Sequence, residues 1–186
     1  MNRCFWVDKK SEIYVNYHDN EWARPSFDDN YLFEMLVLES FQSGLSWLTI
    51  LKKREYFRIA FDNFSPTTIA NYKEKKIQEL LNNPNIIRHR GKIQSTVTNA
   101  KIFLDIQKEF GSFSNYIWGF TDGKVIKNKD DNFVTHSELS DRISKDLKKR
   151  GMKYLGSTTV YSYLEAIGIL NNHSTKCFKY DFKEGI

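Results

Sequence analysis

The two cysteines of this chain, Cys4 and Cys177, stand near its opposite ends, and each has a histidine near it. His173 precedes Cys177 by four positions, so on a helix or a tight turn both side chains can reach one ion. Cys4 and His18 supply a second thiolate and a second imidazole. Two cysteines and two histidines form a closed tetrahedral ligand set, which is typical of structural zinc. Such an ion would join the two ends of the chain, where chains usually fray. The spacing alone leaves open a second interpretation, in which the cysteines are buried and free and the histidines lie on the surface.

Helical periodicity dominates the rest of the sequence, which contains three prolines and nine glycines. We expect a first helix that is capped at Asp28-Asp29 and broken at Ser43-Gly44. The next helix is expected to bury Tyr56 and Ile59 among its apolar residues. That helix is expected at 46–61, and further helices at 65–81, 91–110, 140–149 and 157–170, with a polar loop at 122–132 that has room for a short extended pair. The sequence therefore predicts an all-α protein of about eight helices, formed by residues 1–186 as one domain with two helical lobes.

Size and composition set the broad class of the protein. A chain of 186 residues can fold unaided, because it buries roughly 70% of the surface that it exposes when unfolded. No apolar run approaches the ~20 residues that cross a bilayer, and the first residues contain no signal-peptide core. We therefore expect a cytoplasmic protein that has no membrane contact and no disulfide between its two cysteines. The formal net charge of +5 suits a polyanionic partner, although many basic proteins never bind nucleic acid.

A short turn at 147–160 joins the last two expected helices. Gly151 suits the end of the first helix, and Gly156 lets the backbone approach a ligand just before the second helix begins. The N-terminus of a helix presents free N–H groups and a partial positive charge, so it can hold one DNA phosphate. The groups expected to contact DNA are Lys153, Gly156, Ser157 and Thr158, with Thr159, Lys148, Lys149 and Arg150 around them. This pattern is that of a helix-hairpin-helix element, which positions DNA without reading its sequence. A simple corner between two helices with a solvated basic face is the alternative.

Short motifs that extend over nearly the whole chain carry a family resemblance. They are Cys4-Phe5-Trp6, Tyr17-His18-Asp19-Asn20-Glu21-Trp22, Leu32-Phe33-Glu34-Met35, Leu38-Glu39, Gly44-Leu45-Ser46-Trp47, Leu51-Lys52-Lys53-Arg54-Glu55, Ile86-Ile87-Arg88-His89-Arg90-Gly91-Lys92-Ile93, Leu147-Lys148-Lys149-Arg150-Gly151 and the pair His173 and Cys177. Together they resemble bacterial 3-methyladenine DNA glycosylase I, and the Tyr-His-Asp-x-x-Trp segment with Gly-Leu-Ser-Trp is very specific. The chain departs from the family at Phe5 and at Ala23-Arg24, where small residues or glycine are common.

The resemblance implies a helix-hairpin-helix DNA glycosylase fold in which one structural zinc ion per chain joins the N- and C-termini. The family's four zinc ligands correspond to Cys4, His18, His173 and Cys177. This implication favours the metal site over the alternative of free cysteines.

The resemblance also implies a pocket for the damaged base. Glu39 and Tyr17 correspond to the catalytic residues of the pocket, and Trp6, Tyr14 and Trp47 to its aromatic walls. Glu39 follows several apolar residues and precedes the break at 43–44, which is a poor position for a charge without a role. Core packing is the alternative for each aromatic residue, and a helix-surface acid is the alternative for Glu39.

Four other residues need an interpretation of their own. Leu45 is our candidate to fill the gap that a flipped base leaves in DNA, with core packing as its alternative. We assign Trp22 to core packing. His89 and His136 lack suitable partners along the sequence, so we expect no special role for either.

The chemistry that the resemblance implies follows from the charge of the substrate. Alkylation at N3 gives adenine a positive charge in DNA, so the base leaves as a neutral purine and needs no protonation. The expected enzyme flips this base out of double-stranded DNA that contains alkylated adenine and hydrolyses its N-glycosidic bond. The wider superfamily carries an aspartate about one helix after the hairpin, whereas the corresponding stretch here, 171–173, contains no acid.

We expect a monofunctional enzyme that leaves an abasic site. Strand-cutting relatives use a lysine in the second helix of the hairpin, and 156–161 contains none. A monomer is the default expectation. The alternative from another class is a non-enzymatic, zinc-stabilised module that binds DNA or RNA. Such a module would keep the charge, the zinc and the hairpin, but it would not need Glu39 and Tyr17 beside indole rings.

Overall fold

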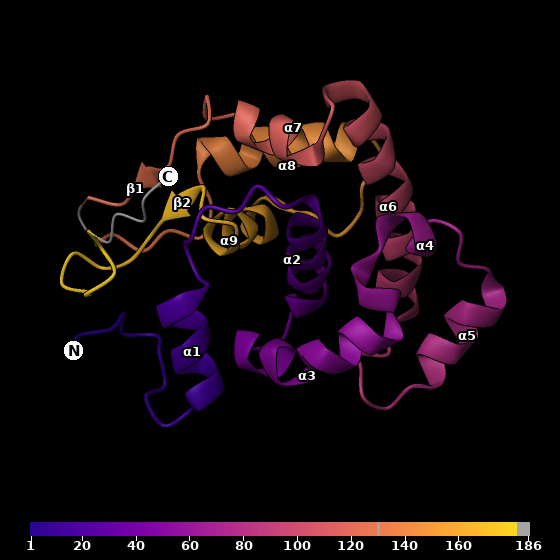
Figure 1. Cartoon of the computed structure of the whole chain (residues 1–186), viewed down its shortest axis with the longest axis horizontal. Coiled ribbons are helices and arrows are strands. Elements are labelled where there is room, and N and C mark those ends of the chain that lie inside the picture. The colour runs from indigo at the N-terminus through magenta and orange to yellow at the C-terminus, as the bar shows by residue number, and fades with distance from the viewer. Residues whose placement is uncertain (130, 182–186) are drawn as a thin grey trace.

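The computed structural model describes residues 1–129 and 131–181, and this part of the chain is an assembly of helices with one very small sheet (Figure 1). In chain order the elements are α1 Glu12–Asn20, α2 Asp29–Gln42, α3 Trp47–Ala60, the 3-10 turn η1 Asp62–Phe64, α4 Pro66–Ile69, α5 Glu74–Asn82, α6 Arg90–Phe110, α7 Phe113–Gly119, β1 Ile126–Lys127, α8 Glu138–Lys149, α9 Ser157–Ala166 and β2 Leu170–Asn171. The all-α prediction is confirmed. Among the described residues, no helix is both long enough and apolar enough to cross a bilayer.

Helix α2 runs through the middle of the molecule (Figure 1). Every residue from Leu32 to Phe41 is buried, which is what a helix surrounded by other elements requires. Its neighbours are α3, η1, α6, α7 and α9. The carboxylate of Asp29 accepts the backbone N–H groups of Phe113 and Ser114 at 2.8 and 2.7 Å. The start of α2 is thereby fixed to the start of α7.

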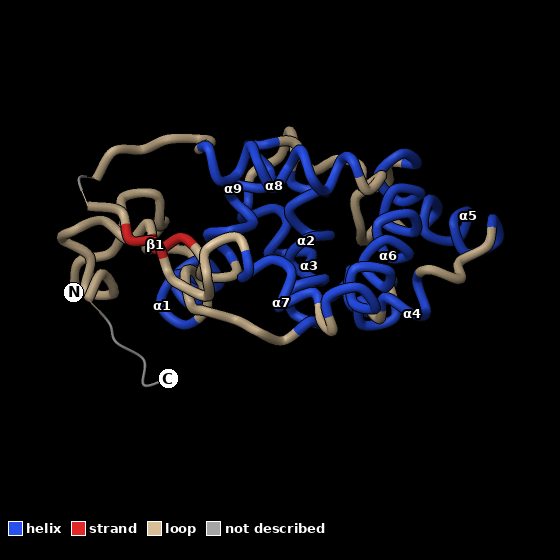
Figure 2. Tube along the Cα trace, turned by 90° about the horizontal axis from the view of Figure 1, so that it is seen from above, coloured by secondary structure: helices blue, strands red, loops and turns tan. Residues whose placement is uncertain are grey.

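Buried apolar side chains form two clusters. The larger one fills the space around α2 and between α3 and α9. The smaller one, which we call the N-terminal cluster, brings the two ends of the described chain together (Figure 2) and contains Cys4, Val7, Tyr17, Trp22, Ala23, Leu51 and Cys177. Trp47 packs against both clusters, so the two meet near the beginning of α3.

The small sheet corrects two expectations. We expected an extended pair within the loop 122–132, but β1 pairs in parallel with β2, far away along the chain. We also expected the last helix to continue to residue 170, whereas α9 ends at Ala166. Gly168 then takes a φ of +80° and lies so close to the backbone of Arg24-Pro25 that a side chain would collide with it. This close approach turns the chain out of the helix.

Other helix boundaries differ from the expected ones, because the sequence at these positions does not fix where each helix begins or ends. The expected helix at 65–81 is two helices, α4 and α5, with a turn between them. Helix α8 begins after Ser137 rather than at the expected residue 140, because the side chain of Ser137 accepts the N–H of Ser140 in a capping box. Helices α1 and α7 were not expected. The cap expected at Asp28 is confirmed, since its side chain accepts an N–H group of α2, and the side chain of Ser46 caps α3 in the same way.

The buried face of α3 also differs from the expected one. Ile59 is 76% exposed and Tyr56 is 49% exposed, whereas Phe57 and Arg54 are buried. The apolar residues of this helix fit two rotations about its axis. In the observed rotation, Phe57 packs against Phe41 of α2, with 4.9 Å between ring centroids.

Candidate active site and metal centre

Cys4, His18, His173 and Cys177 meet in one buried cluster, which we call the Cys/His site. One donor atom from each residue lies within 4.8 Å of the other three. The sulfur of Cys4 is 3.5 Å from Nδ1 of His173, and the sulfur of Cys177 is 3.5 Å from Nε2 of His18. The two sequence pairs thus come together as expected, in an arrangement that could hold a metal ion.

Each histidine of the Cys/His site is also held from its other side. Nδ1 of His18 lies 2.7 Å from Oδ1 of Asp19, and the carboxylate of Asp19 accepts hydrogen bonds from two nitrogens of Arg3. The ring of His173 packs edge-on against the indole of Trp22, with 4.7 Å between ring centroids. Burial lowers the pKa of both histidines, in the case of His173 to about 4. Both imidazoles are therefore kept neutral and fixed in orientation, which is the form that binds metals.

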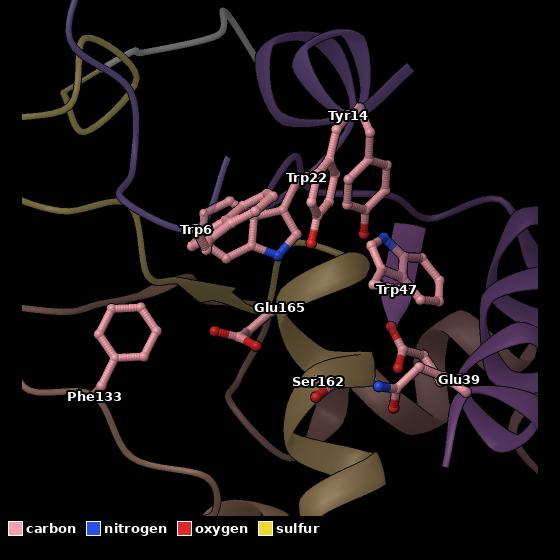
Figure 3. Close-up of a pocket in the computed structure, with 10 residues that line it drawn as sticks. Trp6, Tyr14, Trp22, Glu39, Trp47, Phe133, Ser162 and Glu165 are labelled. Carbon is pink, nitrogen blue, oxygen red and sulfur yellow. The ribbon is translucent and has the colours of Figure 1, made fainter. Parts of the chain in front are cut away.

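A cavity of about 180 Å³ lies beside the Cys/His site, and we call it the aromatic pocket (Figure 3). Trp6 and Trp22 line it, with their ring centroids 4.8 Å apart. Trp6 also packs against His18, and Trp22 against His173. The full lining consists of Trp6, Tyr14, Tyr17, Trp22, Glu39, Gln42, Trp47, Phe133, Ser162 and Glu165. The aromatic pocket and the Cys/His site therefore share a wall.

Glu39 reaches the aromatic pocket from the central helix α2 (Figure 3). Only 4% of its surface is exposed, and no described residue forms a hydrogen bond or an ion pair with its carboxylate. Burial raises the pKa of Glu39 well above its ordinary value, and the neighbouring carboxylate of Glu165 raises it further. A buried carboxylate without a partner costs free energy, so this position favours a ligand that brings positive charge or hydrogen-bond donors.

Two aromatic residues add polar groups to the same pocket. Tyr17 lies with its ring centroid 5.5 Å from that of Trp47, and burial raises the pKa of its hydroxyl well above the ordinary value. The hydroxyl therefore stays protonated and can donate a hydrogen bond. The buried indole N–H of Trp47 has no partner among the described residues. Because buried donors are nearly always satisfied, this one is available to a ligand.

The turn after α2 is held in a fixed shape. Gly44 takes a φ of +84°, which favours glycine. The ammonium group of Lys92, from α6, donates to the backbone carbonyls of Phe41 and Ser43 at 2.9 and 3.0 Å. Leu45 follows directly and is 36% exposed. The side chain expected to fill the gap in DNA thus lies at the surface of a rigid turn.

The expected DNA-contacting turn lies between α8 and α9 and is fastened to α6. The amide of Asn99 accepts the N–H of Lys153 at 2.9 Å and donates to its carbonyl at 3.0 Å. The side chains of Lys153 and Thr158 are exposed. A side chain at Gly156 would meet open space, so the backbone at the start of α9 is accessible to a ligand.

Ser157 has internal partners as well. Its hydroxyl lies 2.8 Å from the hydroxyl of Ser140 and donates a short hydrogen bond to Asp141. The backbone N–H groups at the start of α9 are thus better candidates for a phosphate than this hydroxyl is.

Sequence reasoning missed several residues of the aromatic pocket. Trp22 is buried, as expected, but it also lines the pocket, together with Gln42, Phe133, Ser162 and Glu165. Ser162 and Glu165 are three positions apart on a helix that is otherwise largely buried, so they share a side of it. That polar pair is the signal that could have found them. His89, for which we expected no special role, caps α6 by accepting the N–H of Lys92.

Known proteins resemble this chain in both sequence and structure. A family model described as methyladenine glycosylase matches residues 6–180. The chain is 40% identical to DNA-3-methyladenine glycosylase 1 of Escherichia coli (strain K12) over 183 residues, which is 97% of each chain. It is 43% identical to DNA-3-methyladenine glycosylase of Haemophilus influenzae over 178 residues, covering 94% of this chain and 96% of the relative. A solved structure of 3-methyladenine DNA glycosylase I from Staphylococcus aureus, determined to explain 3-methyladenine recognition, matches with a TM-score of 0.93 at 38% identity and covers 99% of each chain.

Proposed function

Since this chain belongs to the methyladenine glycosylase family, we infer that it excises 3-methyladenine from alkylated DNA. It is a glycosylase that hydrolyses the bond between the damaged base and its sugar, which is a step of DNA repair. The observation in the structure that carries this function is the unpaired carboxylate of Glu39 at the wall of an aromatic pocket. Such a pocket suits a flat cation.

The substrate itself supplies much of the reactivity. A 3-methylated adenine is cationic in DNA and leaves as a neutral base, so no acid has to protonate it. The enzyme has to extrude the nucleotide from the stack and stabilise the base in a closed pocket. Glu39 can accept hydrogen bonds from the adenine edge, and its charge favours the cationic base over a neutral one. Tyr17 can donate a hydrogen bond to the same base.

We propose that indole rings hold the base by stacking. Trp6 and Trp47 line the pocket, and a cation over an indole face gains about 1–2 kcal/mol when desolvated. Tyr14 completes the wall at 5.1 Å from the ring of Trp6. These contacts orient the base so that Glu39 meets its edge.

We propose that the Cys/His site holds one structural zinc ion. Tetrahedral zinc, with Zn–S of about 2.3 Å and Zn–N of about 2.0–2.1 Å, puts a sulfur ligand about 3.5 Å from a nitrogen ligand. The sulfur to nitrogen distances of 3.5, 3.5 and 3.6 Å support this ion. Four protein ligands leave no open position for water, so the ion contributes stability rather than chemistry. Because Trp6 and Tyr17 are close neighbours of ligands in the sequence, they depend on the same ion for their positions.

We propose that α8, α9 and the turn between them act as a helix-hairpin-helix element on double-stranded DNA. The accessible backbone at Gly156 and the exposed Lys153 support contact with one phosphate. Leu45 is then the side chain that enters the stack where the base has left. Without a lysine in the second helix, the enzyme releases the base and leaves an abasic site. We propose that the protein acts as a monomer, since every role above falls on one chain. We further propose that it acts in the cytoplasm.

A nucleic-acid-binding module without catalysis is the alternative function. It would account for the net charge of +5 and for the Cys/His site. It does not explain, however, why a buried and unpaired Glu39 lies at the wall of a cavity. The glycosylase function does explain this. The two are separated by incubating the protein with methylated duplex DNA and measuring the free base by chromatography. A glycosylase releases 3-methyladenine repeatedly and leaves abasic sites, whereas the module releases no base.

A further inference from the structure

A second carboxylate reaches the aromatic pocket, from α9 rather than from α2 (Figure 3). Nδ2 of Asn172 donates to Oε1 of Glu165 at 2.7 Å and to the hydroxyl of Tyr161 at 2.8 Å. Among the described residues, Asn172 is the one that hydrogen-bonds to the carboxylate of Glu165. One oxygen of Glu165 is therefore held in place, and the other is left for a ligand.

Buried acids elsewhere in this protein are treated differently. Glu34 is buried against α3, and Arg54 and Arg58 both donate to its carboxylate, at 2.5 and 3.0 Å. The half-buried Glu21 is paired with Arg54 as well. These acids hold helices together, and each forms an ion pair with at least one arginine. Glu39 and Glu165 have no such partner among the described residues, and both face the same cavity.

The two carboxylates that lack a cation also act on each other. The charge of Glu165 raises the pKa of Glu39, so the two lie near enough to repel. Burial raises the pKa of Glu165 to about 7. Two acids that face one cavity without a cation destabilise the empty pocket. The ligand that relieves this is a cation placed between them.

We propose that Glu165 is a specificity-determining residue of the aromatic pocket, and that its carboxylate acts with that of Glu39 to select a cationic base over a neutral one. The inference rests on the proposed function, because it takes this cavity to be the pocket for the base. A neutral adenine offers no charge to offset the two carboxylates, whereas a 3-methylated adenine in DNA does. Glu165 thereby adds a second charged contact, on a different helix, to the one that Glu39 supplies.

The test uses the full chain and two small probes at a pH near 8, where the carboxylates are most ionised. One probe is 3,9-dimethyladeninium, which is a permanent cation, and the other is 3-methyladenine, which is neutral at this pH. Binding is followed by tryptophan fluorescence, because three indoles line the pocket. Glu165→Gln keeps the size of the side chain and removes its charge. Glu79→Gln, on the exposed side of the distant helix α5 (Figure 1), removes one charge away from the pocket and serves as the matched control.

We expect Glu165→Gln to weaken binding of the cation about tenfold and binding of the neutral base by less than about threefold, as the loss of one charge-assisted contact implies. Glu79→Gln should leave both affinities unchanged. Glu165→Asp keeps the charge and should retain most of the preference for the cation. Equal losses for the two probes, or none with Glu165→Gln, would overturn the inference, as would an aspartate variant that discriminates as poorly as the glutamine variant.

A failure of this inference can be told from a failure of the proposed function. If the wild-type protein releases no 3-methyladenine from methylated DNA, the proposed function is wrong. If it releases the base and Glu39→Gln is impaired, while Glu165→Gln discriminates as the wild type does, only the role of Glu165 is wrong. Melting temperature and zinc content of every variant are measured first. If Glu165→Gln has lost its zinc or melts at a lower temperature, Glu165→Asp is tested in its place. A folded Glu165→Asp variant that no longer prefers the cation would contradict the proposal.

Discussion

The sulfur of Cys4 lies 3.5 Å from Nδ1 of His173, although 169 positions separate the two residues along the chain. Two walls of the aromatic pocket pack against the histidines of this site, since Trp6 lies 5.3 Å from His18 and Trp22 lies 4.7 Å from His173 between ring centroids. The site that joins the ends of the chain therefore also shapes the pocket. Damage to one is expected to appear in the other.

The first prediction concerns the metal. We expect one zinc per chain by elemental analysis, and we expect Cys177→Ser to lose the ion and melt at a lower temperature. Structural zinc contributes on the order of 10 kcal/mol in small peptides, and less is expected in a domain with a core of its own. Calorimetry of the two proteins gives the comparison. A metal-free preparation that is as stable as the zinc-loaded one would show that the site has no structural role.

The second prediction concerns the turn between α8 and α9. Lys153→Glu should weaken binding to every duplex alike and reduce the salt dependence of binding by about one phosphate contact. A bulky residue at Gly156 should have a similar effect and leave the protein folded, since open space surrounds that position. Lys75→Glu, an equal charge change at an exposed position of α5, is the control. Weakening that depends on the flanking sequence would argue against a phosphate contact.

The third prediction separates base removal from strand cutting. No lysine stands between Gly156 and Tyr161, so a covalent intermediate with the sugar is not expected. Borohydride added during the reaction should trap no protein on DNA, and the product should break only after treatment with alkali. A trapped complex at the stoichiometry of the enzyme would contradict the monofunctional mechanism.

The fourth prediction follows from the pKa of Glu165, which burial raises from 4.5 to about 7. Well below pH 4.5 the group is protonated in both the folded and the unfolded state and has no effect on stability. Between these two pKa values the unfolded chain ionises first, so the folded state loses stability as the pH rises, and the loss is complete above about pH 7. Glu165→Gln cannot ionise, so we expect it to exceed the wild type in stability by on the order of 1–3 kcal/mol above that pH. Urea unfolding at several pH values measures the difference in stability. If the higher stability of Glu165→Gln does not decrease toward acid pH, the raised pKa of Glu165 is not its cause.

Some parts of this site could be predicted from the sequence because their signals are local. The four members of the Cys/His site stand in two short spacings, and Glu39 is an acid within an apolar helix. The role of Trp22 could not be predicted in this way, and for Glu165 the only local signal was its spacing from Ser162 on the largely buried α9. Each depends on how α9 and the segment after α1 pack together, and that packing joins residues far apart in the chain. The pairing of β1 with β2 was missed for the same reason.

The most direct test of the glycosylase assignment is single-turnover release of 3-methyladenine by the wild type and by Glu39→Gln. The substitution keeps the size of the side chain and removes the charge that meets the cationic base. A hydrogen bond to a charged partner contributes roughly 1.5–3 kcal/mol, so excision should slow by roughly ten- to a hundredfold, at about 1.4 kcal/mol per decade. Unmodified adenine should stay in the DNA with both proteins. Equal rates from two proteins with the same zinc content and the same melting temperature would mean that the base does not bind at Glu39.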